Sequence, residues 1–140
     1  MGEIKYLLLL LLVVVVILIG CGNRYYINRQ VSADDILGIY VNPDKSRTVK
    51  VYKENGQYFG IIHSAPDEPD GSEGIGFIVF KNFVFDQDDK TWKEGKLHSP
   101  MYARNVFPGT LRLDTNKNLI VRGFIGFKFL GGNSIFPRQN

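Results

Sequence analysis

The chain has 140 residues, of which 44% are hydrophobic and 22% are charged, with a formal net charge of +3. This length supports one hydrophobic core and is too short for two ordinary domains, and a weak, scattered positive charge excludes the basic stripe of a nucleic-acid-binding protein. Because the chain has a single cysteine, an internal disulfide is excluded and the core alone must stabilise the fold.

The N-terminus has the pattern of an exported protein. Uninterrupted apolar residues run from Leu7 to Ile19, a length that fits the hydrophobic region of a signal peptide better than a membrane span of about 20 residues. The following segment, Leu18-Ile19-Gly20-Cys21, resembles the lipobox of bacterial lipoproteins. That resemblance implies that Cys21 receives diacylglycerol, that residues 1–20 are removed, and that the new amino group is acylated. An uncleaved anchor helix is the alternative.

The lipobox also predicts a location. Each buried methylene contributes about 0.8 kcal/mol, so several acyl chains, palmitate for example, would hold the protein on a membrane. We expect a place in the bacterial cell envelope, on the non-cytoplasmic side. Gly22 is not the acidic retention signal known in some bacteria, which favours the outer membrane. Residues 21–35 are predicted to be a lipidated tether, although Tyr25 and Tyr26 fit the start of a folded domain equally well.

Residues 36–140 show the pattern of a β domain. Alternating residues at Thr48–Lys53 and Gln57–His63 flank Asn55-Gly56, a typical hairpin turn. Ile75–Phe85 predicts one bent strand or two. Further extended segments, each bounded by polar turns, are expected at Thr91–His98, Thr110–Leu113, Leu119–Phe129 and Ile135–Phe136. Seven or eight strands at about ten-residue spacing indicate a sandwich or an antiparallel up-and-down barrel in meander order.

Several motifs together resemble DUF2147, a family of uncharacterised bacterial exported proteins. The motifs are Gly38-Ile39-Tyr40, Val49-Lys50-Val51-Tyr52, Gly56-Gln57-Tyr58-Phe59-Gly60, Trp92-Lys93-Glu94-Gly95-Lys96-Leu97, Val121-Arg122-Gly123-Phe124-Ile125-Gly126, and the closing Phe136 and Arg138. The resemblance implies a small, lipocalin-like antiparallel barrel and no known activity. Pro66-Asp67-Glu68-Pro69-Asp70 and Gly131-Gly132-Asn133 depart from the family's usual Asp-x-x-Asn-Pro and Gly-Arg-Thr, so a polar site built from those elements is expected to be altered or absent.

The sequence supports neither an enzyme nor a metal or cofactor site. His63 and His98 lack the further ligands that zinc requires and are expected to be surface residues. Two acidic segments lack the spacing of a calcium loop and are expected to be solvated; they contain Asp67, Glu68, Asp70 and Glu73, and Asp86, Asp88 and Asp89. No nucleophile elbow, phosphate-binding loop or His-Glu-x-x-His motif is present.

Tyr40, Trp92 and Arg122 are the candidate residues for ligand binding or for closing the barrel. The Trp92 ring is predicted to face inward while Thr91 and Lys93 face water. Arg122 shares its predicted face with apolar residues, so its guanidinium needs a partner. That partner is a ligand's carboxylate, a protein acid or the Trp92 ring. We favour a structural role for Arg122 over a ligand-binding one.

These patterns predict a lipid-anchored envelope protein without catalytic activity that binds a small apolar or amphiphilic molecule inside the barrel. An eight-stranded barrel has just enough room for side chains or one small ligand. The alternative is an envelope interaction or scaffold protein with a filled barrel, whose outer surface contacts a protein or cell-wall glycan. The volume inside the barrel distinguishes the two, because only an open apolar cavity supports ligand binding.

Overall fold

The computed structural model describes residues 3–11, 30–66, 74–99, 106–124 and 132–140. Residues 3–11 form a helix whose side chains are exposed. Within the described ranges, no helix combines the length and the apolar character needed to cross a membrane. Cys21 and the predicted cleavage site lie outside these ranges.

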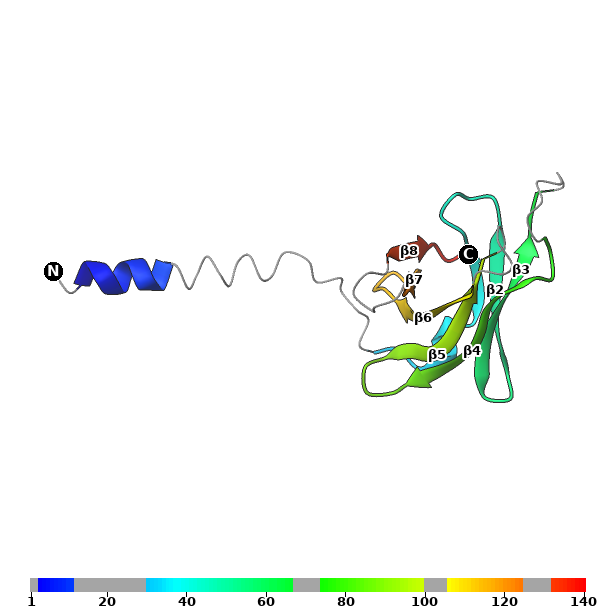
Figure 1. The fold of residues 1–140 in the computed structure, drawn as a ribbon, viewed down its shortest axis with the longest axis horizontal. Coiled ribbons are helices and arrows are strands. Elements are labelled where there is room, and N and C mark those ends of the chain that lie inside the picture. The colour runs from blue at the N-terminus through cyan, green and yellow to red at the C-terminus, as the bar shows by residue number, and fades with distance from the viewer. Residues whose placement is uncertain (1–2, 12–29, 67–73, 100–105, 125–131) are drawn as a thin grey trace.

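Eight antiparallel strands pair in chain order, as the sequence predicts for a meander barrel (Figure 1). A short 3-10 helix, η1 (Ala33–Ile36), precedes them. The strands are β1 (Gly38–Val41), β2 (Thr48–Glu54), β3 (Gln57–Ser64), β4 (Ile78–Asp86), β5 (Thr91–His98), β6 (Val106–Leu113), β7 (Leu119–Gly123) and β8 (Asn133–Phe136).

The residues after β8 close the barrel against β1. Tyr40 and Arg138 form an antiparallel bridge. The backbone N–H of Val41 donates to the Pro137 carbonyl at 2.8 Å, and that of Gln139 donates to the Ile39 carbonyl at 2.8 Å. These bonds satisfy backbone groups of β1 that would otherwise lie on an open sheet edge.

The turn residues explain where the strands begin and end. Asn55 and Gly56, with φ of 51° and 76°, form the predicted turn between β2 and β3. Two positive φ angles are what a tight hairpin turn requires, and Asn and Gly adopt them most readily. β4 is one strand, in which Asn82 has a φ of 61°. β6 begins at Val106, earlier than the expected Thr110.

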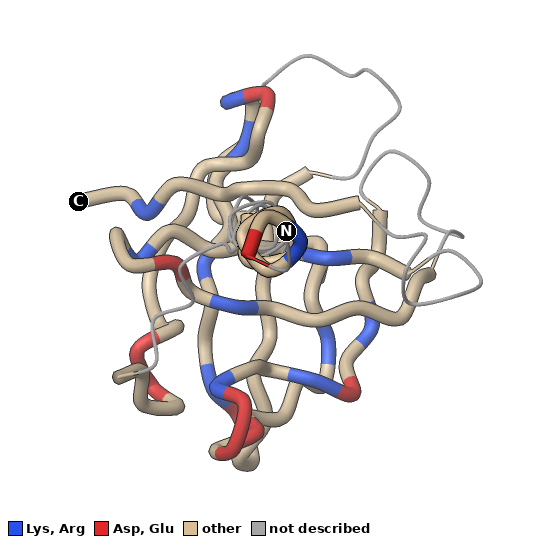
Figure 2. The backbone as a smooth tube through the Cα atoms, turned by 90° about the vertical axis from the view of Figure 1, so that its left-hand side faces the viewer, with Lys and Arg blue, Asp and Glu red and all other residues tan. Residues whose placement is uncertain are grey.

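Because successive strands alternate in direction, the connections gather at two ends of the barrel. We call the end with η1 and the turns after β2, β4 and β6 the closed end. The mouth is the opposite end, where the turn of residues 42–47 joins β1 to β2. Figure 2 shows Lys and Arg interspersed with Asp and Glu over the described part of the barrel, rather than gathered in one stripe.

Two large aromatic side chains pack inside the barrel directly against glycines. A Cβ atom on Gly60 would lie 2.3 Å from the Phe80 ring, and one on Gly95 would lie 2.4 Å from the Phe83 ring. Gly60 and Phe80 are cross-strand partners. Glycine at these positions therefore lets the rings pack directly on the neighbouring backbone.

The folded domain begins before the predicted boundary at residue 36. Val31 has an exposed fraction of 3% and belongs to the core, as does Ile36 at 0%. Ala33 packs against the same cluster. The last residues of the predicted tether are thus part of the domain, because their apolar side chains cover the closed end.

Candidate ligand-binding cavity

Trp92 on β5 joins the barrel core to η1. Its side chain is fully buried, and its indole N–H donates to the Ala33 carbonyl at 3.2 Å. The indole ring lies 4.7 Å from the Phe85 ring and 6.3 Å, edge-on, from the Tyr58 ring, measured between centroids. The one tryptophan of the chain therefore faces inward, where it packs the closed end.

Arg138 and Tyr40 hold the same end together from the C-terminal side. The Arg138 guanidinium donates to the carbonyls of Leu37 (3.2 Å) and Lys117 (3.1 Å), to that of Asp35, and to the Tyr40 hydroxyl at 2.7 Å. That hydroxyl donates in turn to the Ile36 carbonyl at 2.8 Å. Burial raises the pKa of Tyr40 to about 12, although the Arg138 charge acts in the opposite direction. Tyr40 is therefore a neutral hydrogen-bonding group in a structural network.

Asp34 fixes η1 to the β2–β3 hairpin. Its carboxylate accepts a hydrogen bond from the Tyr58 hydroxyl at 2.6 Å and pairs with the Lys53 ammonium at 3.1 Å. The Tyr58 hydrogen bond and then the Lys53 contacts lower the pKa of Asp34. Together with the bonds of Trp92 and Arg138, these contacts make the closed end a structural plug.

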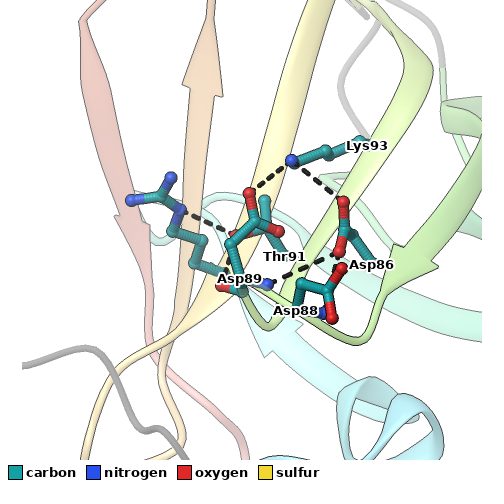
Figure 3. Close-up of polar contacts among 6 residues, drawn as sticks. Asp86, Asp88, Asp89, Thr91 and Lys93 are labelled. Carbon is teal, nitrogen blue, oxygen red and sulfur yellow. Dashed lines mark hydrogen bonds and ion pairs between the residues drawn. The ribbon is translucent and has the colours of Figure 1, made fainter.

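Two carboxylates of the acidic β4–β5 turn pair with a lysine of the protein (Figure 3). The Lys93 ammonium contacts Asp86 at 3.1 Å and also contacts Asp89. Asp86 also accepts a hydrogen bond from the Asp88 backbone N–H at 2.9 Å. Among the described residues, no group of three or more metal-binding side chains could hold an ion.

Thr91 departs from the predicted exposure. Its side chain is fully buried, whereas the alternation around Trp92 predicts that it faces water. The Thr91 hydroxyl donates to the Asp89 carbonyl at 3.0 Å and accepts from Arg112 Nε at 3.1 Å. The long Arg112 side chain on the adjacent strand explains the difference, because it reaches along the outer face and contacts the threonine.

A cavity of about 230 Å³ lies inside the mouth half of the barrel. Its walls are almost entirely apolar and come from strands on all sides: Val49, Ile62, Val79, Phe80, Val121 and Phe136. Asn42, Arg47 and His98 line it near the mouth. The barrel is therefore packed at one end and hollow at the other, and the hollow is an open pocket with mainly apolar walls.

The turn of residues 42–47 fixes the polar side of this cavity. The Asn42 side chain accepts from the Arg47 backbone N–H at 2.9 Å and donates to the Ser46 hydroxyl at 3.1 Å. Asp44 accepts from the Ser46 backbone N–H at 2.9 Å and also from its hydroxyl. Lys45, with a φ of 62°, completes the reversal. The turn is thus tied internally, and it directs Arg47 into the wall with an exposed fraction of only 8%.

His98 was predicted to be a surface residue, but it is partly buried and lines the cavity. Burial, and secondarily the charge of Lys81, lower the pKa of His98 below its usual value. The imidazole is therefore neutral at pH 7 and supplies a hydrogen-bonding group to the mouth. His63, in contrast, is exposed.

Arg122 lies apart from Tyr40 and Trp92. On β7, Leu119 and Val121 face the interior, so the alternation of the strand directs Arg122 outward. Its guanidinium lies 5.6 Å from the centroid of the Phe124 ring. Tyr40 and Trp92 both meet η1 at the closed end, where the arginine is Arg138. In the sequence, Arg138 stands out only as part of the closing family motif, and Arg47 carries no signal of its position.

Comparison with known proteins identifies the family and the type of fold. A model of the family described as "Uncharacterized protein conserved in bacteria (DUF2147)" matches residues 38–138. A solved structure described as protein HP1028 from the human pathogen Helicobacter pylori, which belongs to the lipocalin family, aligns with a TM-score of 0.61. It is 15% identical, and the alignment covers 75% of this chain and 83% of that chain. At this identity the likeness concerns the fold. No curated protein matches the chain.

Proposed function

Since the chain belongs to the uncharacterised bacterial family DUF2147 and folds as a lipocalin-like barrel, we propose that it is a non-catalytic binding protein of the bacterial envelope. In this proposal a lipid on Cys21 anchors the protein to a membrane, with the outer membrane favoured, and the barrel holds one small apolar or amphiphilic molecule.

The cavity is the observation that carries the proposed binding function. Its volume of about 230 Å³ exceeds the roughly 150 Å³ of an apolar cavity that binds benzene in another protein. Its walls offer almost no polar group to hold water, so an apolar occupant is favoured. A scaffold protein that uses only its outer surface would have no need for such a space, and a filled core would be more stable without it.

The proposed anchor rests on the N-terminal sequence. The apolar run ends at Gly20-Cys21, and the described helix of residues 3–11 has exposed side chains, as expected for a leader that does not pack into the domain. We expect Cys21→Ser to give an uncleaved precursor that incorporates no palmitate analogue during metabolic labelling. Labelled Cys21→Ser protein would contradict the anchor, because no other cysteine could take the lipid.

Binding can be tested by filling the cavity. Val121 lines it with an exposed fraction of 7%, whereas Val84 is 37% exposed and lies on the outer face, so Val121→Phe and Val84→Phe make the same change in two places. We expect wild type and Val84→Phe to bind 1-octanol, and Val121→Phe to lose binding at least tenfold. Isothermal titration calorimetry with measured free ligand concentrations checks this. Equal binding by all three proteins, or by none, would contradict the proposal.

A further inference from the structure

The cavity ends at an aromatic floor. Phe80 lines the cavity with an exposed fraction of 4%, and its ring lies edge-on to the Phe136 ring at 5.9 Å between centroids. Phe83 follows on β4 towards the closed end, with its ring 6.4 Å from that of Phe80. The Phe83 side chain is fully buried and does not line the cavity. The Phe80 ring therefore separates the cavity from the packed core.

The Phe80 ring is held in place from several sides. A Cβ atom on Gly60 would lie 2.3 Å from this ring and 3.1 Å from the Val49 side chain, so the ring rests on the backbone of β3. Phe83 and Phe136 pack against it at interplanar angles of 90° and 64°. Because closely packed side chains have little free space to move into, the floor fixes the depth of the cavity.

The walls above this floor offer hydrocarbon rather than polar groups. They include Val49, Ile62, Val79 and Val121, and the surface of the cavity is almost entirely apolar. A charged group that entered this space would lose its water and find few polar groups in return. An alkyl chain gains free energy from every methylene that it buries. The polar end of a ligand therefore stays in water at the open mouth, and the chain enters.

Resting on the proposed binding function, we infer that the cavity selects ligands by the length of an alkyl chain, and that the Phe80 ring sets the upper limit. The terminal methyl group of the chain reaches the Phe80 ring, and the carbons next to the polar end lie near Asn42 and His98 at the mouth. Since the floor is fixed, a longer chain leaves its additional methylenes in water. Phe80 is thus a specificity-determining residue of the cavity.

The cavity volume gives the length at which this limit falls. If about 150 Å³ holds the six carbons of benzene, then 230 Å³ holds an alkyl chain on the order of eight to nine carbons. A buried methylene strengthens binding about three- to fourfold. The affinity for primary alcohols should therefore rise steeply up to 1-octanol and become constant beyond 1-decanol.

The test measures the affinity of the full chain in lipid nanodiscs for 1-butanol, 1-hexanol, 1-octanol, 1-decanol and 1-dodecanol. Equilibrium dialysis against empty nanodiscs gives the free alcohol concentration and subtracts the alcohol that partitions into lipid. The variants are Phe80→Leu, which shortens the side chain at the floor, and Phe59→Leu, which makes the same change outside the cavity. Phe59 is partly exposed on β3 between the buried Tyr58 and Gly60, and its ring stacks on Tyr52.

The ratio of the affinities for 1-dodecanol and 1-decanol reports the limit. We expect a ratio below about twofold for wild type, because neither added methylene is buried. Phe80→Leu deepens the cavity by about two carbons, so its ratio should rise to about tenfold. Phe59→Leu should keep the wild-type ratio. Thermal unfolding of each variant shows whether it is folded.

A second measurement needs no variant. In wild type saturated with 1-octanol, we expect intermolecular nuclear Overhauser contacts between the terminal methyl group of the alcohol and the Phe80 ring protons. The methylene next to the hydroxyl group should instead contact His98 at the mouth. A terminal methyl group without a contact to the Phe80 ring would overturn the inference, whether or not Phe80→Leu folds.

Two binding results would also overturn the inference. One is a wild-type affinity that keeps rising three- to fourfold per methylene up to 1-dodecanol. The other is a folded Phe80→Leu protein that keeps the wild-type ratio. In all three cases 1-octanol still binds, so the proposed function stands. If wild type binds none of the alcohols above the level of empty nanodiscs, the proposed function fails, and this inference fails with it.

Discussion

The two ends of the barrel share the same eight strands and differ in what fills the space between them. At the closed end, the rings of Trp92, Phe85 and Tyr58 pack together, and η1 lies over them with its carbonyls bound by Trp92 and Arg138. At the mouth, smaller side chains such as Val79 and Val121 surround an open cavity. The difference shows that large rings and hydrogen bonds gather at one end of the barrel, whereas the other end is hollow.

Removing the central ring of the closed end should have the largest effect. We expect Trp92→Ala to lower the free energy of unfolding by about 3–5 kcal/mol, the usual cost of emptying a core site of a large aromatic side chain. The variant also leaves the Ala33 carbonyl without its indole donor. Urea denaturation measures the change. A urea midpoint close to that of wild type would show that the closed end is not the stable part of the barrel.

The two arginines allow a comparison of the closed end with the outer surface. Arg138→Met removes the donor for three backbone carbonyls and the Tyr40 hydroxyl, and we expect a loss of about 2–3 kcal/mol. Arg122→Met removes a cation–π contact with Phe124, for which about 1 kcal/mol is expected. Thermal unfolding should rank the variants in this order. The reverse order would give Arg122, and not Arg138, the main structural role.

Gly60 lies where the packed interior meets the cavity. Its cross-strand partner Phe80 leaves no room for a Cβ atom, so Gly60→Ala should displace that ring and destabilise the protein by about 1–3 kcal/mol. Because Phe80 lines the cavity, the variant should also bind 1-octanol differently. Gly123→Ala is the control, since a Cβ there would lie 3.5 Å from Leu97, an ordinary contact. Equal stability of the two variants would contradict close packing at Gly60.

Disrupting the contact between η1 and the β2–β3 hairpin should have the smallest effect, a change in how stability depends on pH. The pKa of Asp34 is lowered in the folded state, chiefly by the Tyr58 hydroxyl. Its contribution to stability is therefore present above the unfolded-state pKa near 3.8 and is lost as pH falls through the folded-state value.

Tyr58→Phe removes that hydrogen bond, so the pKa of Asp34 should rise towards 3.8 and less stability should be lost on acidification. Nuclear magnetic resonance titration of the Asp34 carboxyl measures the shift directly. Lys53→Met removes the ammonium that contacts the same carboxylate and should also raise the pKa of Asp34. An unchanged pKa in Tyr58→Phe would show that η1 is not held by this bond.

The strands and turns could be predicted from the sequence because their signals are local. The Asn55-Gly56 turn and the inward Trp92 both follow from residue type and alternation. The resemblance to DUF2147 predicted the lipocalin-like barrel. The family match confirms the resemblance, and the solved structure confirms the fold. Residues 67–73 and 125–131, which contain much of the departure from the family pattern, lie outside the described residues.

The candidate site was harder to predict because it depends on contacts between distant segments. Arg47 lies in a polar turn, and nothing in the local sequence indicates that it lines a cavity. Its position depends on the turn conformation, which the Asn42 side chain fixes. The role expected of Arg122 at the end of the barrel belongs to Arg138, which is 98 residues from its partner Tyr40. Only the closing Phe136 and Arg138 of the family motif pointed to it.

The mouth half of the barrel is hollow, whereas the closed half is packed. The most direct test is an intermolecular nuclear Overhauser measurement on methyl-labelled full chain saturated with 1-octanol. We predict contacts from the octyl chain to the methyl groups of Val79, Val121 and Ile62, and none to those of Leu113 and Leu119, which are at most 1% exposed. Contacts confined to the outer-face methyl groups of Val84 and Ile135 would contradict the claim.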